Sequence, residues 1–559
     1  MKNILVIILL ICGYSTFSQG NSYEKAWNAL NENKRTEAEK FLQQAMNEPA
    51  TAQDAFITNI YLQTYNGKEN EIRDFPSSFF AKAQNPYPYV YALWFNQAVL
   101  GAYGKKTAAN QLKLTDQLIT DQKAPGTLVA AANYQKGMHF LFSGDFDKAQ
   151  SYYNAIGNIK NWQYTGPFEN LSESGFYKDY GPLEHPEPTA VFKSLSNADV
   201  KWFAPANEIK DGWTPAIYQF NKSTAVIYAQ NFVTSPTDQT VYCNVGCSGS
   251  IKVWINDELV IADPKSRVTE MDNYTVKYGL KKGINRVLVQ LGYTNSSYPN
   301  FSVRFTDEKY NAISNITGSP TYAPYPKNAN VNKKYELIPH FAVKYFKEKI
   351  ESQPDNLVNY LLLADVYLRS ENLLEARDLI TDALKKAPAN SILRVKLLEI
   401  LNKQNNKTLF AEELEKIKQA DPESELVLDL HIKELYNNEK YQDCAAELAN
   451  RIKLHGEDES TADYQILLLI QDKKYDDLVK LSERMYAKYP ENKDLLTIMY
   501  NIKKEVYKDN KGALKIYENY MKNNYNYDTY IKYADILIEQ GNAKKGLEIK
   551  EKLAKTFPY

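Results

Sequence analysis

Apolar and polar residues follow three rhythms along this chain, and the changes of rhythm divide it into parts. From residue 339 to 559, apolar positions recur every three to four residues in paired segments, which is typical of amphipathic helices. Over 159–310 the pattern becomes short alternating runs bounded by Gly, Asn, Asp and Ser, which is typical of an all-β domain. Residues 19–158 are helical in pattern again. We therefore predict a mixed, predominantly α chain in which helical segments flank an all-β domain.

The C-terminal helical segment carries prolines on a lattice with a period of 34 residues. They are Pro354, Pro388, Pro422, Pro490 and Pro558, and the two remaining nodes of the lattice are Gly456 and Asn524. One copy, 357–388, also has the small and large residues that let two helices pack closely: Tyr360, Leu363, Ala364, Tyr367, Ala376, Ile380, Ala383 and Pro388. This pattern resembles the tetratricopeptide repeat, a helix pair closed by a proline. The resemblance implies an α-solenoid of one half repeat and six whole repeats over 339–559, with a concave wall lined by the first helix of each repeat.

Candidate binding residues follow from this resemblance, because the ninth position of the first helix usually points into the groove. Here that position holds Asp365, Glu399, Lys433, Leu467, Asn501 and Asp535. The polar members of this set, all but Leu467, are our peptide-groove candidates. The alternative is a solvated face that binds nothing.

The N-terminal segment, 19–158, shows a looser form of the same design. Gly137, Phe140 and Ala149 take the eighth, eleventh and twentieth positions of a repeat, and 37–45 has the pattern of a second helix. We predict helical repeats here, although the residues between these two stretches are off the lattice.

The alternating segment offers five candidate strands: 224–231, 240–247, 251–255, 286–291 and 301–305. Ser248–Gly249–Ser250 and Asn256–Asp257 are predicted turns. The stretches 250–260 and 280–290, with an opening Trp162–Gln–Tyr–Thr–Gly–Pro–Phe168, resemble galactose-binding-like jelly-roll modules. The resemblance implies a jelly-roll β-sandwich over 159–310. A Pro-, Gly- and Asn-containing linker, 311–338, connects it to the solenoid.

Two aromatic residues in this segment, Trp254 and Tyr242, are candidates for stacking on sugar rings. Alternation places Trp254 on the face opposite Val253 and Ile255, so the indole either meets a ligand or fills a second core. Polysaccharide is therefore an alternative partner.

Charge and the N-terminus bear on partners and location. The chain has 67 basic and 68 acidic residues, a balance that gives no electrostatic reason to bind nucleic acid. Lys2, the apolar run 4–11, and small residues at Thr16 and Ser18 predict a signal peptide over 1–18. Lipid attachment at Cys12 is disfavoured by the bulky Ile11 before it. No other segment approaches the roughly 20 apolar residues of a transmembrane helix. We expect export to the periplasm or cell surface of a Gram-negative bacterium.

The sequence shows no catalytic motif, no cofactor site and no metal site. Cys243 and Cys247 are predicted core thiols on one strand face, and Cys444 takes a small packing position of a repeat. The five histidines lack zinc-ligand spacing, and His431 falls at a packing position of a repeat helix. We expect no enzymatic activity from these residues.

The order of parts resembles the non-catalytic front half of exported Bacteroidetes transglutaminase-like proteins. No polar capping helix follows Pro558, so we expect either a partner over that end or further chain in the natural protein. The sequence thus favours a non-enzymatic scaffold that binds envelope proteins or peptides in its repeat grooves. The alternatives are a carbohydrate-binding accessory protein acting through the jelly roll, and the front part of a transglutaminase-like or protease-like enzyme.

Overall fold

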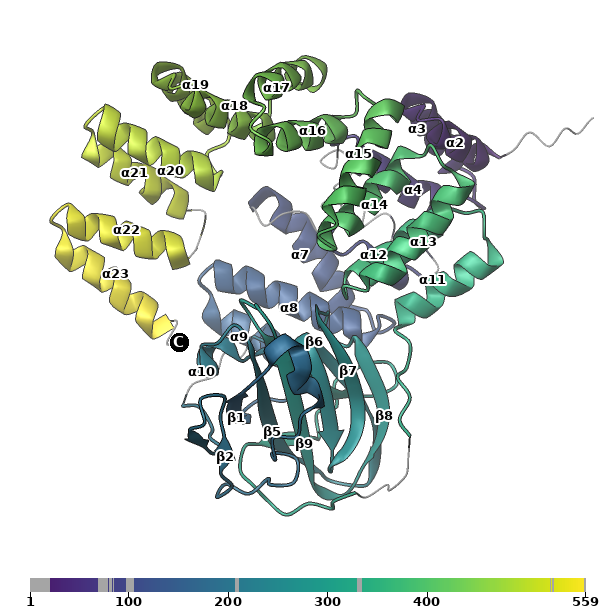
Figure 1. Ribbon diagram of the computed structural model, residues 1–559, viewed down its shortest axis with the longest axis vertical. Helices are drawn as coiled ribbons and strands as arrows, with labels where there is room; N and C mark the ends of the chain where they lie inside the picture. Colours follow the sequence, from purple (N-terminus) through teal and green to yellow (C-terminus); the bar gives the residue numbers. More distant parts are fainter. Residues whose placement is uncertain are drawn as a thin grey trace, which may run out of the picture.

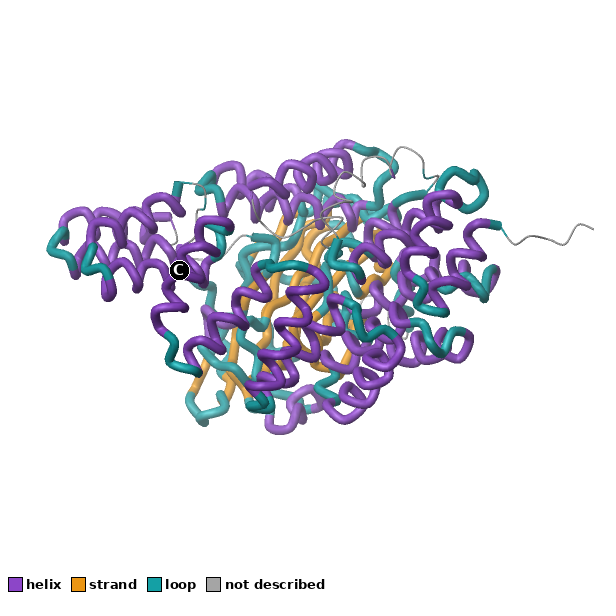
Figure 2. The backbone as a smooth tube through the Cα atoms, turned by 90° about the horizontal axis from the view of Figure 1, so that it is seen from above, coloured by secondary structure: helices purple, strands orange, loops and turns teal. Residues whose placement is uncertain are grey.

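The computed structural model describes residues 21–68, 79, 83, 85–96, 105–206, 211–328, 334–522, 524 and 527–556. The predicted signal peptide, 1–18, and Pro558 lie outside these residues. Helices form an arc above a β domain, and both ends of the arc lie near that domain (Figure 1). Seen from above, the C-terminal helices project to one side of the sheet (Figure 2). None of the helices in the described ranges is long and apolar enough to cross a membrane.

Seven helices in the described chain precede the β domain, and they pack in two groups. Their bounds are α2 Ser22–Asn31, α3 Arg35–Ala45, α4 Ala52–Tyr65, α6 Tyr87–Ala92, α7 Lys105–Thr120, α8 Gly126–Phe142 and α9 Phe146–Ala155. The predicted small position Gly137 is where α8 and α9 pack closely, since a Cβ there would lie 2.2 Å from the Tyr153 ring. Helices α2, α3, α4 and α6 pack against the C-terminal array and share its core, to which α7 and α8 also contribute side chains.

The β domain is one curled antiparallel sheet that contains nine of the described strands. The strands are β1 Gln163–Phe168, β4 Thr214–Pro215, β5 Ala225–Ser235, β6 Gln239–Ile255, β7 Glu258–Val268, β8 Tyr274–Leu280, β9 Gly283–Tyr293, β10 Asn300–Thr306 and β11 Thr317–Ser319. The sheet curls about β6, whose first half pairs with β8 and β10 and whose second half pairs with β7 and β9. Alternate residues of β6, including Cys243, Cys247 and Val253, point into the core between the two halves.

Smaller elements join this sheet to its surroundings. The segment between β1 and β5 contains a 3-10 helix, η2 Leu171–Tyr177, a two-stranded pair of β2 Phe192–Lys193 and β3 Asp199–Val200, and the short helix α10 Ile217–Phe220. This segment covers the outer face of the second half of β6.

Two sequence-based boundaries differ from the structure. Ser248–Gly249–Ser250 is not a turn, since β6 runs through it. The strand bends at Gly249 (φ 144°), where only glycine fits because a Cβ would lie 2.4 Å from the Gly292 carbonyl oxygen. Asn256–Asp257 is a turn as predicted, with φ of 52° and 66°. The predicted linker 311–338 is partly strand, since β11 pairs with β5, and the Tyr325 hydroxyl bonds Asp257.

The C-terminal array consists of stacked helix pairs with the predicted period. It comprises α11 Phe341–Ser352, α12 Val358–Leu368, α13 Leu373–Lys386, α14 Ser391–Lys403, α15 Lys407–Ala420, α16 Glu425–Asn437, α17 Tyr441–His455, α18 Glu459–Gln471, α19 Tyr475–Lys488, α20 Lys493–Asn501, α21 Asn510–Met521, α22 Tyr527–Glu539 and α23 Ala543–Thr556. The first helices from α14 onward begin at 391, 425, 459, 493 and 527, intervals of 34 residues. A π-helical segment, η3 Ile502–Val506, extends α20. The half repeat α11 followed by six pairs is the arrangement that the proline lattice predicts.

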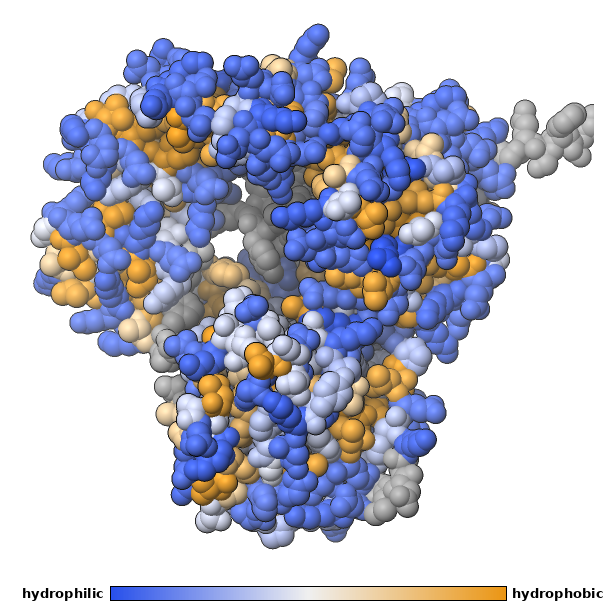
Figure 3. Space-filling model, in the orientation of Figure 1, coloured by the Kyte–Doolittle hydropathy of each residue, from blue (hydrophilic) through white to orange (hydrophobic). Residues whose placement is uncertain are grey.

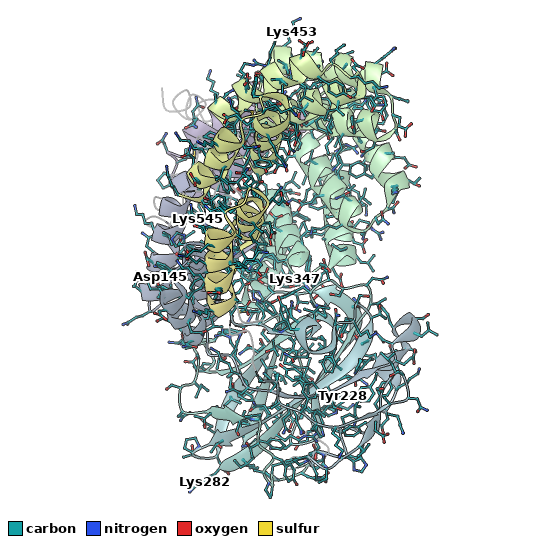
Figure 4. The ribbon with its side chains drawn as sticks, turned by 90° about the vertical axis from the view of Figure 1, so that its left-hand side faces the viewer. Asp145, Tyr228, Lys282, Lys347, Lys453 and Lys545 are labelled. Carbon is teal, nitrogen blue, oxygen red and sulfur yellow. The ribbon has the colours of Figure 1, made fainter. Side chains whose placement is uncertain are left out.

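The hydrophobic core changes character along this array. Helices α11 to α14 belong to one large cluster that includes side chains of α2, α3, α4, α6, α7 and α8. Beyond α14 the described chain has separate, smaller clusters, each holding one or two neighbouring helix pairs. Figure 4 places Lys453 of α17 at the end of the molecule opposite Lys282, which lies between β8 and β9. The first repeats are thus embedded in the body, and the later ones form an arm.

Candidate functional site

The inner wall of the arc is built from the first helix of each pair, with the second helices outside it at α16 to α21 (Figure 1). A space-filling view shows the molecule hollowed between this arm and the helices α7 and α8 (Figure 3). This wall is the surface that the sequence predicted as a peptide groove.

At α12 and α14 the wall is covered by the chain's own N-terminal helices. The Tyr23 hydroxyl of α2 donates to Asn356 Oδ1 (2.9 Å), and Asn356 Nδ2 donates to Asp54 Oδ2 of α4 (2.7 Å). Helix α4 packs on both α12 and α14, and α6 packs on α11 and α12. The first part of the predicted groove therefore already holds a helix.

The predicted groove residues Asp365 and Glu399 belong to a polar network at this contact. The Tyr61 hydroxyl of α4 donates to Asp365 Oδ2 (2.5 Å), and Lys396 Nζ lies 2.6 Å from both Asp365 Oδ1 and Glu399 Oε2. Burial and the adjacent Asp365 carboxylate raise the pKa of Tyr61 well above its usual range, so the hydroxyl remains a donor. Burial also raises the pKa of Asp365 despite Lys396. Asp365, with a side chain 15% exposed, is thus satisfied within the chain rather than open to a peptide.

A second polar contact closes the N-terminal helices onto the end of α15. Arg35 of α3 forms an ion pair with Asp421 (3.0 Å), and the Tyr65 hydroxyl of α4 donates to the same carboxylate (2.8 Å). The two contacts bond α4 at Tyr61 and at its last residue, Tyr65. We conclude that α4 is a fixed part of the wall.

The remaining groove candidates lie on the part of the wall that the N-terminal helices leave open. Lys433 and Asn501 are exposed, as is Leu467 between them at 37%. Asp535 of α22 is half-buried and pairs with Lys550 of α23 (2.5 Å). Of the six ninth-position residues, Asp365 is covered and Glu399 is 45% exposed although it pairs with Lys396. Lys433, Leu467 and Asn501 are open, and Asp535 bonds within its own repeat.

A buried arginine fixes the start of this open wall. Arg451 of α17 is fully buried, and its guanidinium contacts the carboxylates of Glu425, Asp429 and Asp458. Burial raises the pKa of Asp429 to about 6, against the opposing effect of Arg451, and Asp458 and Glu425 add to the rise. One cation thus ties α16, α17 and the N-terminus of α18 together.

The glycan-stacking candidates occupy different places in the sheet. Trp254 is 8% exposed and packs in a second core with Phe168, Phe192, Trp202, Val226, Tyr228 and Leu288. The segment between β1 and β5 covers this core, so the indole fills it rather than facing a ligand. Tyr242 is half-buried on the other half of β6, opposite Lys277 and Thr306. The two aromatics do not form one surface.

The other residues considered for chemistry are used in packing. Cys243, Cys247 and Cys444 are buried free thiols, and burial raises the pKa of the first two to about 12. His431 Nδ1 lies 2.9 Å from Glu447 Oε1 of the same helix pair. Within the part of the chain that the structure describes, no group of three or more His, Cys, Asp or Glu side chains could hold a metal ion.

The outer face of the arm has a depression of about 560 Å³ between α17 and α19. Its floor is mostly apolar, and the buried Gln465 Oε1 on that floor has no hydrogen-bond partner among the described residues. At the lattice position of Gln465, four other repeats have Leu363, Leu397, Met499 and Tyr533, and the preceding repeat has His431. The depression lies where Gln465 replaces the large apolar side chain that most repeats have at this position.

Sequence reasoning missed the residues that decide which part of the wall is open. Tyr61 and Lys396 bond Asp365, whereas Asp463 and Ile470 accompany Leu467 on the open face. Extending the 34-residue lattice from the ninth position to the fifth and twelfth would have found Asp463 and Ile470. Tyr61 belongs to the off-lattice N-terminal region, and the pattern there carries no signal of its contact.

Comparisons with known proteins returned helical-repeat structures. No protein-family model and no curated protein matches the chain. A tetratricopeptide repeat protein from Parabacteroides merdae is 15% identical, with 38% of this chain and 85% of that chain covered at a TM-score of 0.30. PilW, a type IV pilus biogenesis factor, is 17% identical, with 37% and 95% covered at 0.30. Yeast Tom70 is 11% identical, with 96% and 91% covered at 0.28.

Likenesses at these TM-scores carry no functional argument. The tetratricopeptide-type architecture of the array rests instead on its own geometry: helix pairs at 34-residue intervals, with small residues such as Ala364 and Ala376 fully buried between them. Arrays of this type are scaffolds for contacts between proteins.

Proposed function

We propose that this chain is an exported, non-catalytic scaffold that binds a segment of another envelope protein on the open inner wall of α16 to α22. One observation carries the proposal: the same helix face that holds α4 at α12 and α14 is not covered further along the array by any of the described residues. Stacked helix pairs form extended concave surfaces that suit protein segments. Export rests on the predicted signal peptide.

Site-specific photo-crosslinking tests where the partner binds. A crosslinking amino acid is placed at Lys433 or Asn501 on the inner wall, or at Lys480 on the outer helix α19 as the matched exposed control. We expect the same envelope protein to crosslink from both inner positions and not from Lys480. Equal crosslinking from the control would remove the proposal.

Export is tested separately. Mass spectrometry of the protein recovered from the periplasm should give an N-terminus near Gln19. Recovery of the uncleaved chain in the cytoplasm would contradict export and leave the binding proposal standing.

No observation on the described residues favours the alternative in which the chain binds carbohydrate through the β domain. Trp254, its main candidate, fills a core, so replacing it should lower stability before it affects any ligand.

A further inference from the structure

The face of α18 corresponds, three repeats further along, to the face of α12 that holds the N-terminal helices. In α12 this face comprises Leu361, Asp365 and Leu368, and the two leucines are 0% and 8% exposed beneath α4 and α6. Three 34-residue repeats later, the same positions are Asp463, Leu467 and Ile470. There Leu467 is 37% exposed and Ile470 is 48% exposed. This face of α18 is still partly apolar, but no part of the described chain covers it.

The charge next to this apolar face is unbalanced. Partial burial raises the pKa of Asp463, and the neighbouring carboxylates of Asp494, Glu459 and Asp458 raise it further. In the described ranges neither Asp463 nor Asp494 forms an ion pair, and Lys433 is the exposed cation at the ninth position of the preceding repeat. The N-termini of α18 and α20 stabilise the negative charges of Asp458, Glu459 and Asp494, which lie at the starts of these helices. Asp463 lies one turn further along α18 and does not receive this stabilisation. A cation brought by a partner would relieve the repulsion around Asp463.

The existing contact at α12 and α14 indicates what form the occupant takes. There the wall holds α4 as a helix, whose contacts extend from Asp54 through Tyr61 to Tyr65. The open wall at α18 continues that interface with the same helix spacing. An amphipathic helix can present apolar side chains to Leu467 and Ile470 and a basic side chain to Asp463.

We propose that Asp463, Leu467 and Ile470 of α18 bind an amphipathic helix of a partner protein, one that carries leucine-like side chains on one face and lysine or arginine beside them. The proposal rests on the proposed scaffold function and specifies its partner class. Apolar burial supplies the affinity, and charge complementarity supplies the orientation and the preference for a basic partner.

Three synthetic peptides of roughly 18 residues, long enough to be helical, test the partner class. The first has a leucine face flanked by lysines, the second replaces the lysines with glutamates, and the third replaces the leucines with serines. Binding to the full chain is measured by fluorescence anisotropy. We expect the leucine–lysine peptide to bind at least tenfold more tightly than either of the others.

Variants of the chain locate the binding face. Leu467→Ser with Ile470→Ser should weaken the leucine–lysine peptide at least tenfold, and Asp463→Asn should weaken it severalfold and reduce its salt dependence. The matched controls are Leu547→Ser on α23, where the side chain is 53% exposed, and Asp477→Asn on the outer helix α19. Both should leave affinity unchanged. Circular dichroism melts should show that every variant is folded, since all five positions are at the surface or half-buried.

Equal binding of the glutamate peptide, or unchanged affinity of the Leu467→Ser and Ile470→Ser variant, would overturn the proposal. The crosslinking experiment distinguishes a failure of the scaffold proposal from a failure of the proposed partner class. Crosslinks from Lys433 and Asn501 together with insensitivity to the α18 variants would retain the scaffold and reject this partner class. Absence of inner-wall crosslinks would reject both.

Discussion

Arg369, at the end of α12, joins the three parts of the molecule, and replacing it with alanine should loosen all three. Its guanidinium donates to the Tyr91 carbonyl of α6 (2.6 Å) and lies 3.6 Å from the centre of the Tyr91 ring. It also forms an ion pair with Glu270, between β7 and β8 (3.2 Å). The Arg369 side chain is 3% exposed, so these contacts are made almost without water.

The expected loss follows from the type of contact. Removing one partner of a buried ion pair costs about 3–5 kcal/mol, because the remaining charge has lost its counter-ion. Glu270 is 24% exposed and recovers some hydration, which moves the expectation to the lower end of that range. The stacking on Tyr91 and the bond to its carbonyl are lost together with the ion pair, and the contributions are not additive. We expect a loss of about 3 kcal/mol for Arg369→Ala, which is on the order of a hundredfold in an opening equilibrium.

Hydrogen exchange read by mass spectrometry is the suitable assay, because a chain of several parts need not unfold in one step. Exchange should accelerate in 85–96 and 258–280, the segments on either side of Arg369. Arg369→Lys keeps the charge but loses the planar stacking, and should have an intermediate effect. The control is Arg377→Ala on α13, where a half-buried side chain forms its ion pair with the exposed carboxylate of its neighbour Asp378. Equal, small effects of Arg369→Ala and Arg377→Ala would refute this account of the junction.

Three further predictions concern single positions. Lys473 closes α18 with φ of 59°, so Lys473→Gly should raise the free energy of unfolding by about 1 kcal/mol in thermal melts, whereas Lys480→Gly inside α19 should lower it by about as much. Burial and then the charge of Arg369 lower the pKa of His340 to about 3, below that of the unfolded chain, so its stabilisation is lost as pH falls. Between about pH 7.5 and 5 the wild type should lose about 2 kcal/mol more than His340→Asn, which keeps the helix cap, in urea titrations. The pKa shift of Asp429 has the opposite effect, because its pKa of about 6 exceeds the unfolded value and its ionised form destabilises the fold. Asp429→Asn should therefore raise the free energy of unfolding by about 1–2 kcal/mol near pH 8, and this increase should fade as pH falls from about 6 to 4.

The sequence predicted the array because its repeat is enforced by local geometry. Each pair needs small side chains where helices cross and a break where the second helix ends, so residues such as Ala364 and Pro388 recur at a fixed interval. The turns inside the pairs repeat as well: Glu371, Asn405, Glu439 and Lys473 all have positive φ and lie 34 residues apart. None of them is glycine, so composition alone gives no sign of these turns.

The sequence could not show which part of the wall is open, because that depends on contacts across hundreds of positions. Asp365 and Leu467 are equivalent in the repeat, and the contact that places Asp365 under the N-terminal helices comes from Tyr61, 304 residues away along the chain. The same holds for Trp254, since alternation assigns it to the outer face of β6, and only the folding of the segment between β1 and β5 turns that face into a core. Strand β7 was missed because its Asp263–Pro264–Lys265 has the composition of a loop.

The embedded repeats and the arm differ in the size of their hydrophobic cores, and this difference predicts how a bound partner would affect local stability. In stacked repeats, stability is approximately the sum of each repeat and its contacts with neighbours. Helices α12 and α14 share one large core with the N-terminal helices, while α16 to α20 depend on small separate clusters, so the arm should open locally at lower cost. A partner helix on α18 would lie beside α16 and α20 and link those clusters. Binding of the leucine–lysine peptide should therefore slow hydrogen exchange in 425–501 and leave 358–403 unchanged. Equal slowing in both segments would show that the peptide acts on the body rather than on the arm.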